Sequence, residues 1–204
     1  MNITLIIILS TVAISFIAWN KTEIYNQLIF NPYSVFHRKA WYRMFSGALL
    51  HADIPHLAIN MLVLYSFGNY MEYVYSELMP MGSTMYLLLY ILSIAAANVK
   101  TLFENKNNVW YNAVGASGAV SAVVFAYVLY APIDKILFFG LIPIPAFLYG
   151  ILYLVYSQYM SKKANDNIGH DAHFYGAVFG FAFTGLLKPE LFKLFITQII
   201  NWQK

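Results

Sequence analysis

The sequence lacks cysteine and is poor in charged residues, and each shortage excludes a class of protein. Without cysteine, the chain cannot form disulfides, use a thiol nucleophile or bind zinc through sulfur. Charged residues make up 10% of the 204 residues, whereas soluble domains contain about 25%, so they are too few to cover a water-facing surface. The small net charge of +3 and the lack of a basic cluster in the sequence indicate that no nucleic acid is bound.

Two kinds of hydrolytic site are also missing from the sequence. His51 and His56 have no glutamate directly after the first of them, so the H-E-x-x-H helix of zinc proteases is absent. The apolar segments contain no pair of aspartates, which excludes an aspartyl-type site inside a membrane. We therefore expect neither a metal nor another cofactor.

Apolar residues are abundant and make up 60% of the chain. A membrane-spanning helix needs about 20 mostly apolar residues, and several segments approach that length. The predicted spans are Ile3–Trp19, His56–Tyr73, Thr84–Val99, Val114–Tyr130, Ile136–Tyr159 and Ala172–Leu187. The first span lacks the basic flank and the cleavage site of a signal peptide, so we expect it to be retained.

Because the apolar segments run nearly end to end, we predict one all-α membrane domain, a six-transmembrane-helix bundle over residues 1–188. Residues 189–204 begin with a proline and have a broken apolar stripe, which favours a short helix at the membrane interface. Residues 20–55 would form a long first loop whose aromatic rings lie among the lipid headgroups. The polar segment 160–170 is the best candidate for a mobile cover.

The second, fourth and sixth predicted spans run in the same direction, and unusual polar residues stand at the start of each. These residues are His56, Asn60, Ser117, His170 and His173. They should therefore lie toward one side of the membrane. Histidine inside a membrane is rare and is by default a candidate for a functional site, although we expect His170 to be wetted by the headgroups.

Taken alone, Ser117 is better explained by packing than by chemistry, because serine is common where membrane helices meet. Small residues recur at every fourth position of the fourth span (Gly118, Ala122 and Ala126) and of the sixth (Gly176 and Gly180). These rows predict that the two helices touch. Their contact would bring the Ser117 hydroxyl to the His173 imidazole, the nucleophile and base of acyl-transfer enzymes.

His56 and Asn60 fall on one face of a helix because they are four residues apart. Two donors on one face suit an oxyanion that develops beside Ser117, whose backbone N–H could be a third donor. Alternatively, both side chains tie the second span to a neighbouring helix. Asp171 cannot face His173 on a helix, so we interpret it as the N-cap of the sixth span and predict a catalytic dyad.

From about Arg43 to Gly185, these motifs resemble the rhomboid family of intramembrane serine proteases. The matching residues are His51, His56 and Asn60 in HADIPHLAIN, Gly115, Ser117 and Gly118 in GASG, and His173, Gly176 and Gly180 in AHFYGAVFG. Gly68 and Glu72 fit the family's Gly-x-x-x-Glu at the end of the second helix.

The resemblance implies a six-helix fold in which Ser117 is the nucleophile and His173 the general base. It assigns His56, Asn60 and the Ser117 N–H to the oxyanion hole and makes His51 a structural member of the site. The motif glycines, Gly115, Gly118, Gly176 and Gly180, would support the site. It also implies cleavage of other proteins' transmembrane helices, with residues 136–170 as the gate.

The chain departs from the family's pattern at three points. Tyr42 stands in place of the tryptophan that precedes the first-loop arginine. Ser121 stands where the family often has an aromatic ring on the imidazole, so the sequence does not indicate how the His173 ring is oriented. Of the 12 Lys and Arg residues, eight fall in the loops that the family's orientation places outside, against the positive-inside rule.

The sequence therefore predicts a metal-independent serine endopeptidase that cleaves transmembrane proteins in the lipid bilayer. We expect the family's orientation in a bacterial inner membrane, with the active site opening to the outer side. One alternative is an inactive rhomboid-like protein that binds or escorts membrane helices. Another is a proton-coupled transporter that uses His56 and His173, but the broken half-helices and repeats of transporters are missing. The sequence leaves the substrate and the oligomeric state open.

Overall fold

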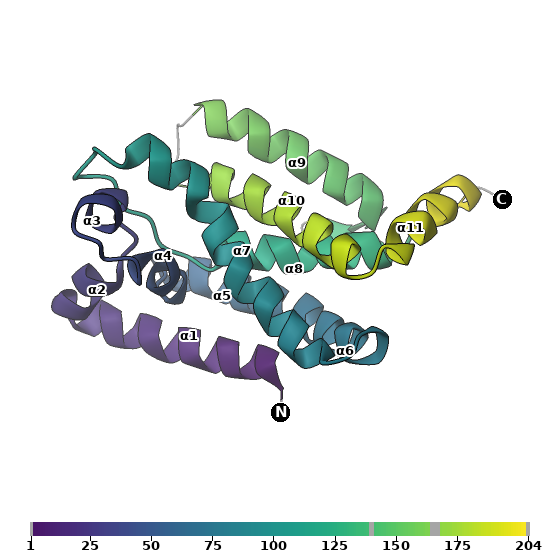
Figure 1. The fold of residues 1–204 in the computed structure, drawn as a ribbon, viewed down its shortest axis with the longest axis horizontal. Coiled ribbons are helices and arrows are strands. Elements are labelled where there is room, and N and C mark those ends of the chain that lie inside the picture. Colours follow the sequence, from purple (N-terminus) through teal and green to yellow (C-terminus); the bar gives the residue numbers. More distant parts are fainter. Residues whose placement is uncertain (1, 139–140, 164–167, 203–204) are drawn as a thin grey trace.

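The computed structural model describes residues 2–138, 141–163 and 168–202, and its bulk is a bundle of helices (Figure 1). The long helices are α1 (Ile3–Asn20), α7 (Gly82–Asn105), α8 (Ser117–Tyr130), α9 (Ala146–Lys163) and α10 (His170–Leu187). Between α1 and α7, helix α5 (Ile54–Val63) continues through a π-helical turn (Leu64–Gly68) into α6 (Asn69–Leu78). These elements overlap all six of the predicted spans.

Helix α8 is the centre of the bundle. Every residue from Gly118 to Ala126 is buried, because α7, α9 and α10 pack around this helix (Figure 1). With 14 residues, α8 is about 21 Å long, which is shorter than the roughly 30 Å hydrocarbon core of a bilayer. The nucleophile candidate Ser117 is the first residue of this short and enclosed helix.

The first helix is anchored at its amino-terminal end by a buried acid. The Glu72 carboxyl group accepts hydrogen bonds from the backbone N–H groups of Ile3 and Thr4 at 2.7 and 2.8 Å, and from the Thr4 hydroxyl at 2.8 Å. The Thr4 hydroxyl also lies 2.9 Å from the hydroxyl of Tyr86 on α7. Glu72 therefore accepts orphan donors of the first turn of α1 and fixes that helix to α6.

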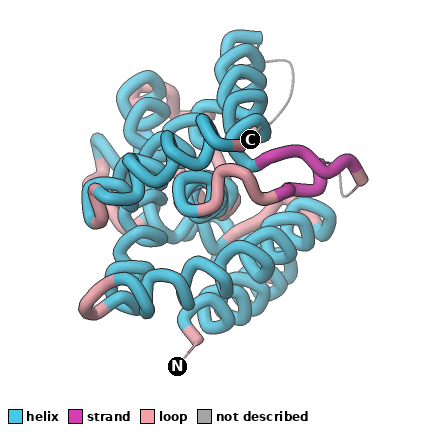
Figure 2. Tube along the Cα trace, turned by 90° about the vertical axis from the view of Figure 1, so that its right-hand side faces the viewer, coloured by secondary structure: helices cyan, strands magenta, loops and turns pink. Residues whose placement is uncertain are grey.

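The fifth predicted span was wrong in where its helix begins. The antiparallel strands β1 (Lys135–Phe138) and β2 (Ile142–Pro145), shown in magenta in Figure 2, occupy its first part, residues 139–140 lie outside the described residues, and α9 begins only at Ala146. Pro143 and Pro145 disfavour a helix because they lack a backbone N–H and restrict the residues before them. A short apolar run cannot be assigned to helix or strand by periodicity alone.

One further boundary differs from the prediction. The fourth helix begins at Ser117 rather than Val114, because Gly115 has a φ of +122°, outside the range of a right-handed helix. The predicted first loop contains three short helices and a 3₁₀ turn, namely α2 (Thr22–Leu28), α3 (Pro32–His37), α4 (Arg43–Ser46) and η1 (Gly47–Leu49). Its position in the headgroup region stays a prediction.

The number of membrane spans also stays a prediction. Within the described residues, α1 and α7 are long and apolar enough to cross a membrane. The segments Arg43–Leu49 and Ile54–Leu78, bent by 96° at the break between them, would make a third span if they cross together. Residues 160–163 of the predicted mobile cover extend α9, and residues 164–167 of it lie outside the described residues.

The predicted carboxy-terminal helix is present as α11 (Glu190–Asn201), which follows Pro189 and lies at one end of the bundle (Figure 1). Its residue Leu191 is buried, and the Phe192 ring packs against Gly185 of α10. The division of the chain after residue 188 and the location of α11 in the membrane interface stay predictions.

Candidate active site

The turn before α8 holds Ser117 in place. The N–H of Gly115 donates to the carbonyl of Gly47 at 3.0 Å, and the N–H of Ala116 donates to His51 Nε2 at 3.5 Å. The left-handed φ of Gly115 allows the chain to enter the helix directly after this turn. Ser117 is half-buried at the first position of α8, directly before a run of buried residues.

The predicted contact between the fourth and sixth helices is confirmed. A Cβ atom at Gly176 would overlap the carbonyl of Gly118, and one at Gly180 would overlap the carbonyl of Ala122. Helices α8 and α10 therefore approach backbone to backbone, which only glycine permits at these positions. His173 lies on α10 almost one turn before Gly176, beside the first turn of α8.

The structure brings the Ser117 hydroxyl and the His173 imidazole together. The distance between Ser117 Oγ and His173 Nε2 is 2.8 Å, and both side chains are half-buried. At this distance a neutral imidazole can accept the hydroxyl proton, which is how a weak alcohol becomes a nucleophile. The two residues come from different helices, so the pair exists only because α8 and α10 pack so closely.

An aromatic ring that the sequence analysis missed lies against the imidazole. The ring of Tyr153 on α9 stacks on His173 with a centroid distance of 6.2 Å and an interplanar angle of 26°. The Tyr153 hydroxyl lies 2.6 Å from Ser121 Oγ, and Ser121 donates to the Ser117 carbonyl at 2.8 Å. The sequence carries no signal for this ring, because Tyr153 is one of several aromatic residues on α9.

His56 and Asn60 lie on the same face of α5, as predicted from their spacing. The His56 ring borders the turn before the nucleophile, since a Cβ atom at Gly115 would lie 2.8 Å from Cε1 and 3.0 Å from Nε2 of that ring. The Asn60 amide donates to the His56 carbonyl at 2.9 Å, and it carries a second hydrogen that this bond does not use. Asn60 thus contacts its own helix, while His56 lies beside the Ser117 turn.

His51 is completely buried and joins three parts of the chain. Its Nε2 accepts from Ala116, so Nδ1 carries the proton of the neutral ring and faces Ser15 Oγ at 3.2 Å. Its carbonyl accepts from the indole N–H of Trp19 at 2.8 Å. Burial lowers the pKa of His51 to about 4, because the charged ring would lose its hydration.

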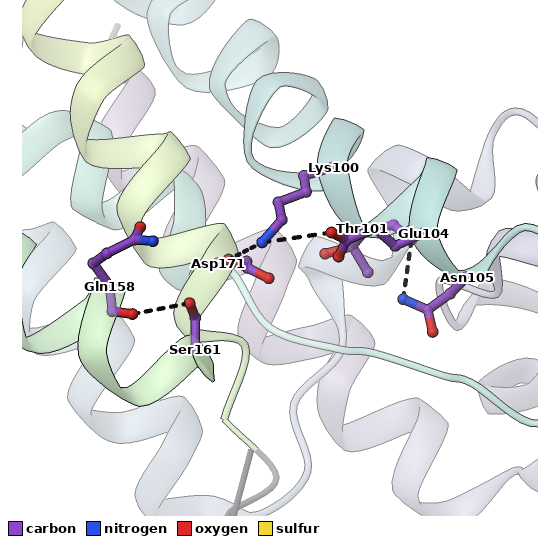
Figure 3. A network of polar contacts seen from close by, with 7 residues as sticks. All are labelled: Lys100, Thr101, Glu104, Asn105, Gln158, Ser161 and Asp171. Carbon is purple, nitrogen blue, oxygen red and sulfur yellow. Dashed lines mark hydrogen bonds and ion pairs between the residues drawn. The ribbon is translucent and has the colours of Figure 1, made fainter. Parts of the chain in front are cut away.

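Two expectations about the start of the sixth helix were wrong. Asp171 is not the N-cap, because α10 begins at His170 and Gly169 precedes it. Instead, Asp171 forms an ion pair of 2.8 Å with Lys100 of α7, which also lies 3.6 Å from Glu104 (Figure 3). His170 is buried rather than exposed to headgroups, because its ring packs edge-on against those of His173 and Tyr156.

The described residues contain no cluster of three histidine, aspartate or glutamate side chains that could hold a metal ion. The polar groups that the structure places at or beside Ser117 are instead the imidazoles of His173, His56 and His51 and the first N–H groups of a helix. Such a set can move a proton and donate hydrogen bonds to an oxyanion.

Comparison with known proteins gives the same family over most of the chain. A model of the Rhomboid domain matches residues 38–190. Rhomboid protease GluP of Bacillus subtilis (strain 168) is 29% identical over 152 residues, which are 74% of this chain and 28% of that protein. RHOMBOID-like protein 12, mitochondrial, of Arabidopsis thaliana is 28% identical over 145 residues, which are 66% of this chain and 43% of that protein.

Rhomboid-like protein 15 of Arabidopsis thaliana is 21% identical over 167 residues, which are 79% of this chain and 40% of that protein. The chain thus spans less than half the length of each of these three relatives. The family model, in contrast, matches well over half of the chain, including every motif residue from His51 to Gly180. The chain therefore belongs to the rhomboid family and is an integral membrane protein built as a helical bundle.

Proposed function

We propose that the chain is an intramembrane serine endopeptidase that hydrolyses peptide bonds in or near the transmembrane segments of other membrane proteins. The observation that carries this proposal is the 2.8 Å contact between Ser117 Oγ and His173 Nε2. A serine that served packing alone would not need an imidazole aligned with its hydroxyl. The name of the Bacillus subtilis relative, a rhomboid protease, also supports the proposal.

The first half of the proposed reaction forms an acyl-enzyme. Ser117 Oγ attacks the carbonyl carbon of the substrate while His173 Nε2 takes its proton, which gives a tetrahedral intermediate with a negatively charged oxygen. The Ser117 backbone N–H and the side chains of His56 and Asn60 would donate to that oxygen. The C–N bond then breaks, and His173 returns the proton to the leaving amine.

The second half of the reaction restores the enzyme. A water molecule attacks the ester carbonyl of the acyl-enzyme while His173 Nε2 takes a proton from it. When the new tetrahedral intermediate collapses, the bond to Ser117 Oγ breaks and His173 gives its proton back to the serine oxygen. His51 keeps the turn before Ser117 in place through its bond to the Ala116 N–H and takes no part in proton transfer.

The proposal also includes a route by which the substrate reaches Ser117. A transmembrane segment would reach Ser117 past α9 and the segment that joins it to α10, and the site would open to the outer side of a bacterial inner membrane. The exposed apolar face of α9, with Ile151, Leu152 and Val155 toward the surroundings, suits contact with lipid and with a substrate helix. The opening of the site to the outer side is taken from the orientation of the rhomboid family in the membrane.

The proposal is tested by labelling and cleavage with the purified protein in detergent, in the presence of a chelator. We expect a fluorophosphonate probe to label Ser117, and Ser117→Ala and His173→Ala to lower cleavage of a single-span substrate by on the order of a thousand-fold or more. Ser10→Ala removes an exposed hydroxyl on α1 and serves as the matched control. Cleavage by Ser117→Ala at the wild-type rate would refute the proposal.

A folded wild-type protein that is not labelled and cleaves no member of a panel of single-span substrates would favour the inactive, helix-binding alternative. Mapping the cut sites in that panel by mass spectrometry identifies the substrate class and the preferred residues beside the cut.

A further inference from the structure

One of the rings that pack against His173 comes from a helix that holds neither member of the dyad. Ser117 belongs to α8 and His173 to α10, whereas the ring stacked on the imidazole, Tyr153, belongs to α9. We propose that Tyr153, anchored through Ser121, is a positioning residue that holds the His173 imidazole against Ser117. This inference rests on the proposed function.

The hydrogen bonds around Ser121 have only one consistent direction. Ser121 donates its single hydroxyl hydrogen to the Ser117 carbonyl at 2.8 Å, so it must accept from the Tyr153 hydroxyl at 2.6 Å. A chain of hydrogen bonds therefore runs from Tyr153 through Ser121 to the backbone of the nucleophile itself. The far end of the Tyr153 ring is fixed to the same residue whose hydroxyl faces His173.

Neighbouring rings hold the plane of Tyr153. Its ring lies 5.8 Å from that of Tyr149 with an interplanar angle of 26°, and 5.6 Å from that of Phe125 at 51°. Tyr149, Tyr153 and His173 thus form a stack in which each neighbouring pair is tilted by the same 26°. Parallel, offset rings at such distances attract one another, so the imidazole lies at the end of a preformed aromatic column.

A stacked ring can restrain the imidazole because the outer torsion of a histidine is soft. The second side-chain torsion of histidine has broad minima, and a modest rotation about it carries Nε2 away from a partner at 2.8 Å. A ring stacked on one face opposes that rotation. Ser121 is too small to stack on the imidazole, and the structure places Tyr153 in contact with both residues.

This arrangement limits how the substrate can enter. If α9 moved outward as a whole, the aromatic column would leave His173 and the anchor to Ser121 would break. The first half of α9 is held by close packing, since Ala146 and Gly150 are buried and a Cβ at Gly150 would lie 3.3 Å from Val128. An opening of the site would therefore have to lie beyond Tyr153, toward Lys163, rather than along the whole of residues 136–170.

The test compares the rate at which the fluorophosphonate labels Ser117 in four variants. Tyr153→Leu removes the ring and should lower the labelling rate and kcat for a single-span substrate by about 10- to 100-fold, with KM within about twofold. Tyr153→Phe keeps the ring and should lose only about two- to fivefold. Ser121→Ala breaks the same anchor and should match Tyr153→Phe, and combining the two should bring no further loss.

Tyr73→Leu is the matched control, because it removes an exposed ring from α6, outside the dyad and α9, and should leave the labelling rate unchanged. If Tyr153→Leu fails to fold, Tyr153→Phe and Ser121→Ala decide the question, since both keep the packing volume. Equal labelling of wild type and these variants would overturn the inference but leave the proposed function intact. Failure of the wild type itself to be labelled would instead overturn the proposed function.

Discussion

At the scale of single residues, His51 shows how a buried polar group can be accommodated without charge. Both ring nitrogens of this residue have partners, and the pattern of donors fixes the neutral tautomer with the proton on Nδ1. A protonated ring would carry a second donor toward the Ala116 N–H, which is itself a donor. His51 therefore links the stability of the bundle to pH through a single ring.

We predict that stability falls as the pH is lowered from about 6.5 toward 4. The folded-state pKa of about 4 lies below the ordinary histidine pKa of 6.5, because burial disfavours the charged ring. The contribution of His51 to stability is thus fully present above pH 6.5 and is lost as the pH falls toward and through the folded pKa. At pH 5 the loss in the free energy of unfolding is about 2 kcal/mol. Thermal unfolding in detergent at pH 7.5 and pH 5 measures this loss.

The matched control for the pH prediction is His51→Gln, which keeps a polar group but cannot be protonated. Its melting temperature should be lower than that of wild type at pH 7.5 and should depend less on pH. An equally steep fall in the variant would show that another group causes the acid sensitivity.

At the scale of elements, the dyad depends on the backbone contact between α8 and α10. Gly176→Ala would place a methyl group against the Gly118 carbonyl, and neither helix can move without repacking. We expect a loss of about 2 kcal/mol in stability and a more than tenfold loss of Ser117 labelling, because the imidazole retreats from the hydroxyl.

Gly150→Ala is the control for this helix contact. The added methyl would lie 3.3 Å from the Val128 side chain, which can yield, and the better helix propensity of alanine offsets that contact by about 1 kcal/mol. This variant should be as stable as wild type or more so. If both variants behave alike in thermal unfolding and in labelling, close approach of α8 and α10 is not what holds the dyad.

The elements also show which parts of the site could be read from the sequence. The rows of small residues predicted the contact of α8 and α10, because two helices can approach closely only where small residues recur at every fourth position. The pairing of strands β1 and β2 was missed, because a short apolar run fits a strand or a buried helix equally well. Tyr153 was missed because the ring that stacks on an imidazole is chosen by tertiary packing and not by sequence spacing.

At the scale of the whole molecule, α1 connects the far end of the bundle to the site. Its first turn is fixed by Glu72, while its last turns carry Ser15 and Trp19, which contact His51. In the sequence, only the family's Gly-x-x-x-Glu motif singled out Glu72. The contact to α1 joins residues almost seventy positions apart, which no local pattern indicates. The helix thereby stabilises both ends of the fold.

We predict that Glu72→Gln lowers the melting temperature while Ser117 remains reactive at low temperature. The variant keeps one acceptor oxygen but turns an amide toward the backbone donors of Ile3 and Thr4, so a buried donor loses its partner at a cost of about 1–3 kcal/mol. Glu77→Gln, on the exposed side of the same helix, should leave the melting temperature unchanged. Because Glu72 touches neither Ser117 nor His173, the rate of Ser117 labelling at 10 °C should stay within about threefold of wild type. A loss of labelling in a variant that is still folded would contradict a purely anchoring role for Glu72.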